Sequence, residues 1–162
     1  MRRDEVNPQE IESIPEALRE HVDSPGNPNA EQFRRLLSAN LEGPLHFVNL
    51  LAFKEMAEYP TDHPLANEQL SGAQAYNNYG AVALEQVLKR GGRLVTLNSV
   101  EQQLIGANRQ WHQIATMEYK QVNAFIEMLL DPEYQAALVH RDAGLEATEV
   151  FVSRPLIAQP VG

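Results

Sequence analysis

Two side chains capable of acid–base chemistry, Glu118 and His112, fall on one expected strand, residues 111–119. Even-numbered residues of a strand share a face, so both side chains are expected on the same side of the sheet. A carboxylate near an imidazole can act as a general base with a proton partner. The alternative is structural: Glu118 pairs with Arg141 or Arg93 and fixes a helix to the sheet, because buried charges usually occur in pairs. Between the two, we favour the structural role.

Four other side chains are candidates for ligand binding. Asn49 interrupts an apolar strand, where an unpaired amide is costly, so it is either a buried hydrogen-bond anchor or a ligand contact. Tyr76 and Tyr79 are three residues apart on one helical face, either as core residues or as the wall of a pocket for a flat substrate. Arg141 could receive a carboxylate in a bidentate fork, or it could pair with Glu118 or an acidic residue of its own helix.

No residue pattern calls for a metal or a cofactor. The histidines show no paired helical spacing, and the chain has no cysteine to supply thiolate ligands. One histidine among several is no evidence for a haem. Gly91-Gly92 ends an expected helix, whereas a phosphate-binding glycine loop would begin one. We therefore expect neither a metal site nor a bound cofactor.

Charge and composition narrow the class of protein. The 162 residues carry a formal charge of −9 and are 43% hydrophobic, as in an ordinary globular domain. An acidic surface repels phosphate backbones and anionic lipids, which argues against nucleic-acid and membrane partners. The arginines at positions 2 and 3 precede no apolar stretch, so we expect no secretory signal and a cytoplasmic location.

The first part of the chain, residues 1–44, is expected to form a helical arm. Ser13, followed by Pro15 and Glu16, is typical of a helix start, and this helix would end near Val22. Asn29 can cap a second helix with one apolar stripe. Residues 45–156 then form the main domain, and residues 157–162 a tail.

The main domain has the expected order strand, helix, strand, strand, helix, strand. The strands are residues 46–53, 93–97, 111–119 and 148–153; the helices begin after Ser71 and at Val122, and Pro132 restarts the second one. Residues 54–70 form a long polar loop of the kind that often serves as a lid or binding loop. This order predicts an α+β, ferredoxin-like fold with a four-stranded antiparallel sheet.

The pattern of the strands predicts self-association. Both helices of such a unit cover one face of the sheet, yet residues 46–53 are apolar on both faces. A second copy stacked on the open face would bury it, and we expect a homodimer for this reason. The alternative is that the arm covers that face.

Six motifs in this order resemble the domain-of-unknown-function family 1330, of the dimeric α+β barrel superfamily. They span residues 43–155 and comprise Val48-Asn49-Leu50-Leu51-Ala52-Phe53-Lys54, Tyr76 with Tyr79, Gly91-Gly92-Arg93, Glu118-Tyr119, Asp131-Pro132-Glu133-Tyr134-Gln135-Ala136-Ala137, and Arg141. The resemblance implies the ferredoxin-like fold and a homodimer. Because Glu118 and Arg141 both match the family pattern, we expect Glu118 to be buried, with Arg141 as its partner.

The resemblance implies no single activity, since members of the family are mostly uncharacterised and fold alone does not choose a function. Wider relatives include cofactor-free monooxygenases, lactone isomerases, haem-dependent peroxidases and small-ligand sensing domains. Two hypotheses follow. The protein is a cofactor-independent enzyme, monooxygenase- or isomerase-like, acting on a small molecule, or it is a non-catalytic small-ligand-binding or assembly module.

Overall fold

The computed structural model describes residues 14, 16–20, 22 and 26–157 and divides the chain into two compact units, residues 1–42 and 43–162. The first unit contains α2 (Glu16–Arg19) and α3 (Ala30–Ser38). Asn29 caps α3 in a full capping box with Gln32, as its sequence predicts. The expected cap at Ser13 lies outside the described residues, and α2 ends at Arg19, before the expected Val22.

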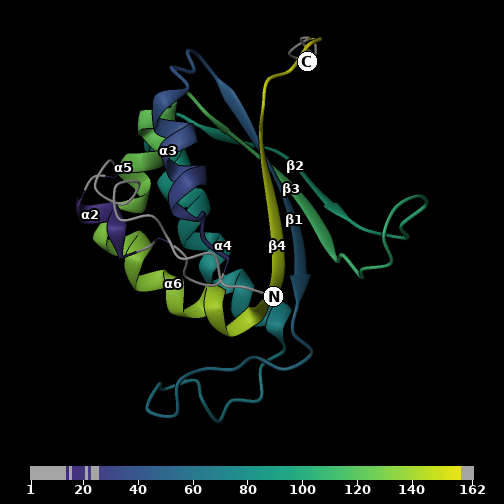
Figure 1. Cartoon of the computed structure of the whole chain (residues 1–162). Helices are drawn as coiled ribbons and strands as arrows, with labels where there is room; N and C mark the ends of the chain where they lie inside the picture. Colours follow the sequence, from purple (N-terminus) through teal and green to yellow (C-terminus); the bar gives the residue numbers. More distant parts are fainter. Residues whose placement is uncertain (1–13, 15, 21, 23–25, 158–162) are drawn as a thin grey trace. The chain divides into compact units, whose positions relative to one another are not determined.

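The second unit contains the rest of the secondary structure. In chain order its elements are β1 (Leu45–Phe53), α4 (Gly72–Lys89), β2 (Arg93–Ser99), β3 (Gln113–Tyr119), α5 (Val122–Leu129), α6 (Pro132–Gly144) and β4 (Leu145–Ser153). Figure 1 shows α4, α5 and α6 along one face of the sheet. Ser71 caps α4 and Asp131 caps α6, as predicted. None of the helices described is long and apolar enough to cross a membrane.

The four strands form one antiparallel sheet in the order β2-β3-β1-β4. This order, with one helix after β1 and two helices between β3 and β4, is the ferredoxin-like arrangement expected from the sequence. The strand β4 is longer than expected, because pairing with β1 begins at Leu145 directly after α6. The strand β3 is shorter than expected and begins at Gln113.

The odd-numbered residues of β1 face the helices. Phe47 contacts Phe125 of α5, with ring centroids 4.8 Å apart, and Phe53 contacts Tyr76 of α4 at 5.1 Å. The even-numbered residues of β1 therefore point to the opposite face, which we call the open face of the sheet. Across the register they lie beside Ile114 and Thr116 of β3 and Phe151 of β4.

Two glycines let α4 and α6 meet at the end of β1. A Cβ atom at Gly72 would clash with the backbone oxygens of Lys54 and Gly144, and one at Gly144 would clash with the backbone oxygen of Gly72. The amide of Lys54 donates to the Gly144 carbonyl at 2.9 Å, and the amide of Gly72 donates to the Lys54 carbonyl at 3.1 Å. The start of α4, the end of α6 and the end of β1 are thus fixed to one another.

Candidate functional site

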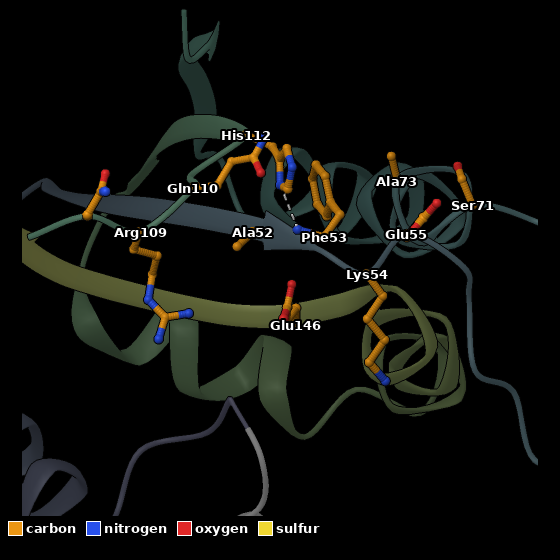
Figure 2. A pocket seen from close by; sticks show the side chains of 11 residues that line it. Ala52, Phe53, Lys54, Glu55, Ser71, Ala73, Arg109, Gln110, His112 and Glu146 are labelled. Atoms are coloured by element: carbon orange, nitrogen blue, oxygen red, sulfur yellow. Dashed lines mark hydrogen bonds between the residues drawn. The ribbon is translucent and has the colours of Figure 1, made fainter. Parts of the chain in front are cut away.

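A cavity of about 700 Å³ opens at the carboxyl end of β1 (Figure 2). Its wall is formed by the end of β1, the start of α4, the β2–β3 loop and the first residues of β4. Its lining consists of Ala52, Phe53, Lys54, Glu55, Ser71, Ala73, Asn108, Arg109, Gln110, His112 and Glu146. The cavity volume falls in the range of about 300–1,000 Å³ typical of sites for small organic molecules.

His112 is fixed in one tautomer in the wall of this cavity. Its Nδ1 accepts a hydrogen bond from the backbone amide of Phe53 at 2.9 Å, drawn as a dashed line in Figure 2. The neutral ring must therefore carry its proton on Nε2. The imidazole is also stacked on the Phe53 ring, with centroids 5.6 Å apart and planes at 13°. His112 consequently offers a hydrogen-bond donor at Nε2 and has no free nitrogen to act as a base.

The backbone around His112 explains its position. The His112 amide donates to the carbonyl of Leu51 at 2.8 Å, and its carbonyl accepts from the amide of Val100 at 2.9 Å. These bonds continue the sheet one residue beyond β3. Residues 101–110 then leave the sheet as a loop that carries Asn108, Arg109 and Gln110 to the cavity.

Glu146 reaches the cavity through a β-bulge. In the β1–β4 pairing Ala52 lies opposite Ala147, whereas Phe53 lies opposite Leu145, so Glu146 is an extra residue in β4. Bulges of this kind redirect a side chain out of the regular alternation of a strand. Figure 2 shows the Glu146 carboxylate and the Arg109 guanidinium on opposite sides of Ala52, both in front of β4.

The remaining charges of the cavity belong to Lys54 and Glu55. The ammonium group of Lys54 donates to the Glu58 carboxylate at 3.0 Å and to the Asp142 carbonyl at 3.2 Å, so its charge is already balanced. Arg109 lies over the ring of Trp111, 5.5 Å from the centroid. Within the described part of the chain, no ion pair involves Arg109, Glu55 or Glu146.

The structure separates Glu118 from two of the residues expected near it, Arg141 and His112. Glu118 points to the open face, where it accepts hydrogen bonds from Arg93 Nε at 3.0 Å and Arg93 Nη2 at 3.3 Å. The His46 Nε2 lies 2.8 Å from Glu118 Oε2. Our expectation of a buried Glu118 with Arg141 as its partner is therefore wrong: the Glu118 side chain is 22% exposed, α6 packs on the other face, and the alternative partner, Arg93, is the one present. His112 is about 20 Å from Glu118 along the strand, at about 3.3 Å per residue, so the two do not form an acid–base pair.

Three of the predicted ligand-binding residues come together between the helices and the sheet. The rings of Tyr76 and Tyr79 are 5.2 Å apart, and the Arg141 guanidinium lies over the Tyr79 ring at 5.9 Å from its centroid. The Tyr79 hydroxyl is 2.9 Å from the hydroxyl of Tyr134. Burial is the main cause of a raised pKa at Tyr76, and the nearby Tyr79 is the second cause. Tyr79 and Tyr134 are buried, and their rings pack between the helices and the sheet.

Asn49 lies on the helix-facing side of β1. Its amide group donates to the carbonyls of Phe47 at 3.0 Å and Ala115 at 3.1 Å. The amide therefore serves as an anchor within the sheet, the first of the two roles considered for it.

The loop between β1 and α4, residues 54–70, is attached to α6 by a group of three aromatic side chains. The Tyr59 hydroxyl is 2.8 Å from His140 Nδ1, and the Tyr59 and His63 rings are stacked at 4.5 Å. The His63 ring meets His140 edge-on at 5.7 Å. Among the residues described, no three histidine or acidic side chains are grouped as a metal site would require.

The sequence did not reveal most of the cavity. In the sequence, His112 is a candidate for another role, and Phe53, Arg109 and Glu146 are not among the candidate site residues. The one sequence feature that could have indicated the cavity is the polar loop after β1. Lys54 and Glu55 at the start of this loop line the cavity, as does Ser71 just after it. The bulge that redirects Glu146 depends on the pairing register, which has no signature in this sequence.

Comparisons with known proteins agree with this architecture. The model of the family described as domain of unknown function (DUF1330) matches residues 64–155. Two crystal structures of a protein of unknown function from Rhodopseudomonas palustris, RPA0582, one of them methylated, are 32% identical with a TM-score of 0.73. They cover 85% and 83% of this chain, and 97% and 99% of their own. No curated protein matches the sequence.

Proposed function

Since the chain belongs to the DUF1330 family, whose description names no activity, we propose a function from its own site: it is a homodimeric, non-catalytic module that binds a small polar molecule. The observation that carries the proposal is the cavity of about 700 Å³ at the end of β1, walled by His112 and Phe53 and bordered by charges of both signs. Apolar walls with a few convergent polar groups are typical of ligand sites.

Neither of the two candidate acid–base residues, Glu118 and His112, is placed to act as a general base in the cavity, which favours binding over catalysis by this pair. Glu118 is engaged by Arg93 and His46 on the open face, away from the cavity. His112 Nδ1 is occupied by the Phe53 amide, which leaves only a donor. A general base needs an acceptor within hydrogen-bond reach of the proton it removes, and neither residue offers one there. The proposed function needs no cofactor.

The open face of the sheet supports the homodimer. Val48 and Leu50 of β1 lie beside Phe151 of β4 and Ile114 of β3, and together they form an apolar strip. Phe151, on the edge strand β4, is 56% exposed. A second copy of the sheet stacked face to face would bury the strip, as aligned sheets do in β-sandwiches.

Two experiments test the proposal. Calorimetric titration with a panel of small carboxylates, amines, amino acids, lactones and sugars should give heat of binding for at least one class, and the heat should disappear in Phe53→Ala together with His112→Leu. An inert panel would refute the binding function.

Sedimentation should give a species of twice 18.2 kDa, which Phe151→Glu converts to 18.2 kDa. The control is Leu88→Glu on α4, at a side chain that is 55% exposed and lies away from the strip. A wild-type monomer would refute the dimer.

A further inference from the structure

We propose that the cavity at the end of β1 takes a zwitterion that carries an aromatic side chain, as an aromatic α-amino acid does. This inference rests on the proposed binding function and adds the class of ligand. The residues that carry it are Arg109, Glu146 and the stacked pair of Phe53 and His112.

The two charges form the first part of the argument. Arg109 and Glu146 border the same cavity from opposite sides of Ala52 (Figure 2). Neither takes part in an ion pair among the described residues, and both are exposed. A guanidinium presents a planar fork that matches a carboxylate, and a carboxylate accepts hydrogen bonds from an ammonium group. A ligand with both groups would complement both walls, whereas a simple acid or amine would leave one charge facing it uncompensated.

The bulge in β4 strengthens the assignment of Glu146. In a regular β4 the side chains would alternate strictly between the two faces, but the extra residue between Leu145 and Ala147 breaks this alternation. Bulges are over-represented next to active sites, where they redirect a side chain, and this one places a carboxylate in the wall of the cavity.

The aromatic wall of the cavity is the argument for an aromatic side chain on the ligand. Phe53 is 7% exposed, and its ring is held on one side by Tyr76 and on another by His112. Because so little of Phe53 is exposed, the pair of Phe53 and His112 favours a flat apolar group on the ligand through edge-to-face contacts at its rim. The Nε2 proton of His112 adds a donor, which suits the carboxylate end of the ligand.

Three probes separate these contributions: phenylalanine, 3-phenylpropanoate, which lacks the ammonium group, and 2-phenylethylamine, which lacks the carboxylate. By calorimetry the wild-type protein should bind phenylalanine about ten-fold or more tightly than either analogue, as loss of a hydrogen bond to a charged group implies. Arg109→Met should erase the preference over 2-phenylethylamine alone. Glu146→Gln should erase the preference over 3-phenylpropanoate alone. Arg154→Met and Glu85→Gln, exposed changes at residues that do not line the cavity, should preserve both preferences.

The outcomes distinguish the two proposals. If phenylalanine fails to bind, or an analogue binds as tightly, the zwitterion is wrong. The binding function still stands in that case if a lactone, sugar or other member of the wider panel binds and requires Phe53 and His112. If neither the probes nor the wider panel bind, both proposals fail.

Discussion

His46 and Glu118 face each other across the β1–β3 pair, with 2.8 Å between His46 Nε2 and Glu118 Oε2. Arg93, on the neighbouring edge strand, completes a fork on the same carboxylate. The cluster lies on the open face, so a carboxylate, an imidazole and a guanidinium join three strands of the sheet and leave the helices out.

Replacing Glu118 by glutamine should cost little stability. The Arg93 side chain is 59% exposed, so its guanidinium stays solvated when the carboxylate is removed. We expect Glu118→Gln to lower the free energy of unfolding by about 1 kcal/mol, as for ion pairs with access to water. A buried arginine would have implied a cost of about 3 kcal/mol or more. Urea denaturation at neutral pH measures the difference, and a loss of that larger size would contradict the exposed geometry.

The same pair predicts an acid-dependent term in stability. Hydrogen bonds from Arg93 and then from His46 lower the pKa of Glu118 below its usual value. A lowered folded-state pKa stabilises the protein above the unfolded pKa, and this contribution is lost as the pH falls through the folded pKa. The gap between wild type and Glu118→Gln should therefore be largest near neutral pH and close in acid. Denaturation of both proteins across the acid range tests this, and a gap that widens in acid would contradict it.

His140 should titrate below an ordinary histidine. Burial is the main cause that lowers the pKa of His140 from its usual 6.5, and the nearby His63 is the second cause. His140 therefore binds a proton more readily in the unfolded chain than in the folded one. This difference destabilises the fold as the pH falls below about 6.5. Imidazole NMR resonances should show the low pKa, and His63→Gln should raise it. An unchanged His140 pKa in that variant would remove His63 as a cause.

The contact between α4 and α6 should be intolerant of a methyl group. In Gly144→Ala the new Cβ atom would lie 2.8 Å from the Tyr76 amide nitrogen and would clash with the Gly72 carbonyl. We expect a loss of about 1–3 kcal/mol, as for overpacking. Gly80→Ala on α4 is the control: a Cβ atom there would meet no atom within 4 Å outside its own turn of helix backbone, and alanine should stabilise the helix by about 0.5–1 kcal/mol. Thermal denaturation compares the two, and equal effects would contradict the close contact.

The fold could be read from local patterns, because each pattern has its own physical cause. Asn29, Ser71 and Asp131 cap helices as their side chains predict, and the order of strands and helices specifies the sheet. Contacts between distant segments were harder. The parity of Glu118 on β3 was correct, but which face meets the helices was not encoded locally, so Arg141 was the wrong partner.

The cavity depends on long-range features. His112 was chosen for its chemistry, yet its role depends on the hydrogen bond from Phe53, 59 residues away. Arg109 sits in a loop without periodicity, and Glu146 enters through a shift in register. Each of these residues acquires its position only when the sheet is assembled.

The central claim, a ligand site at the end of β1, is tested most directly by amide and imidazole NMR spectra recorded during titration with phenylalanine and with the wider panel of small polar molecules. The account predicts saturable shifts centred on Phe53, Ala73 and His112, with the His112 Nε2–H signal among those that move most. Resonances of His63 in the 54–70 loop and of His140 on α6, which do not line the cavity, should stay in place. Spectra that remain unchanged with every compound, or shifts that avoid the cavity, would contradict it.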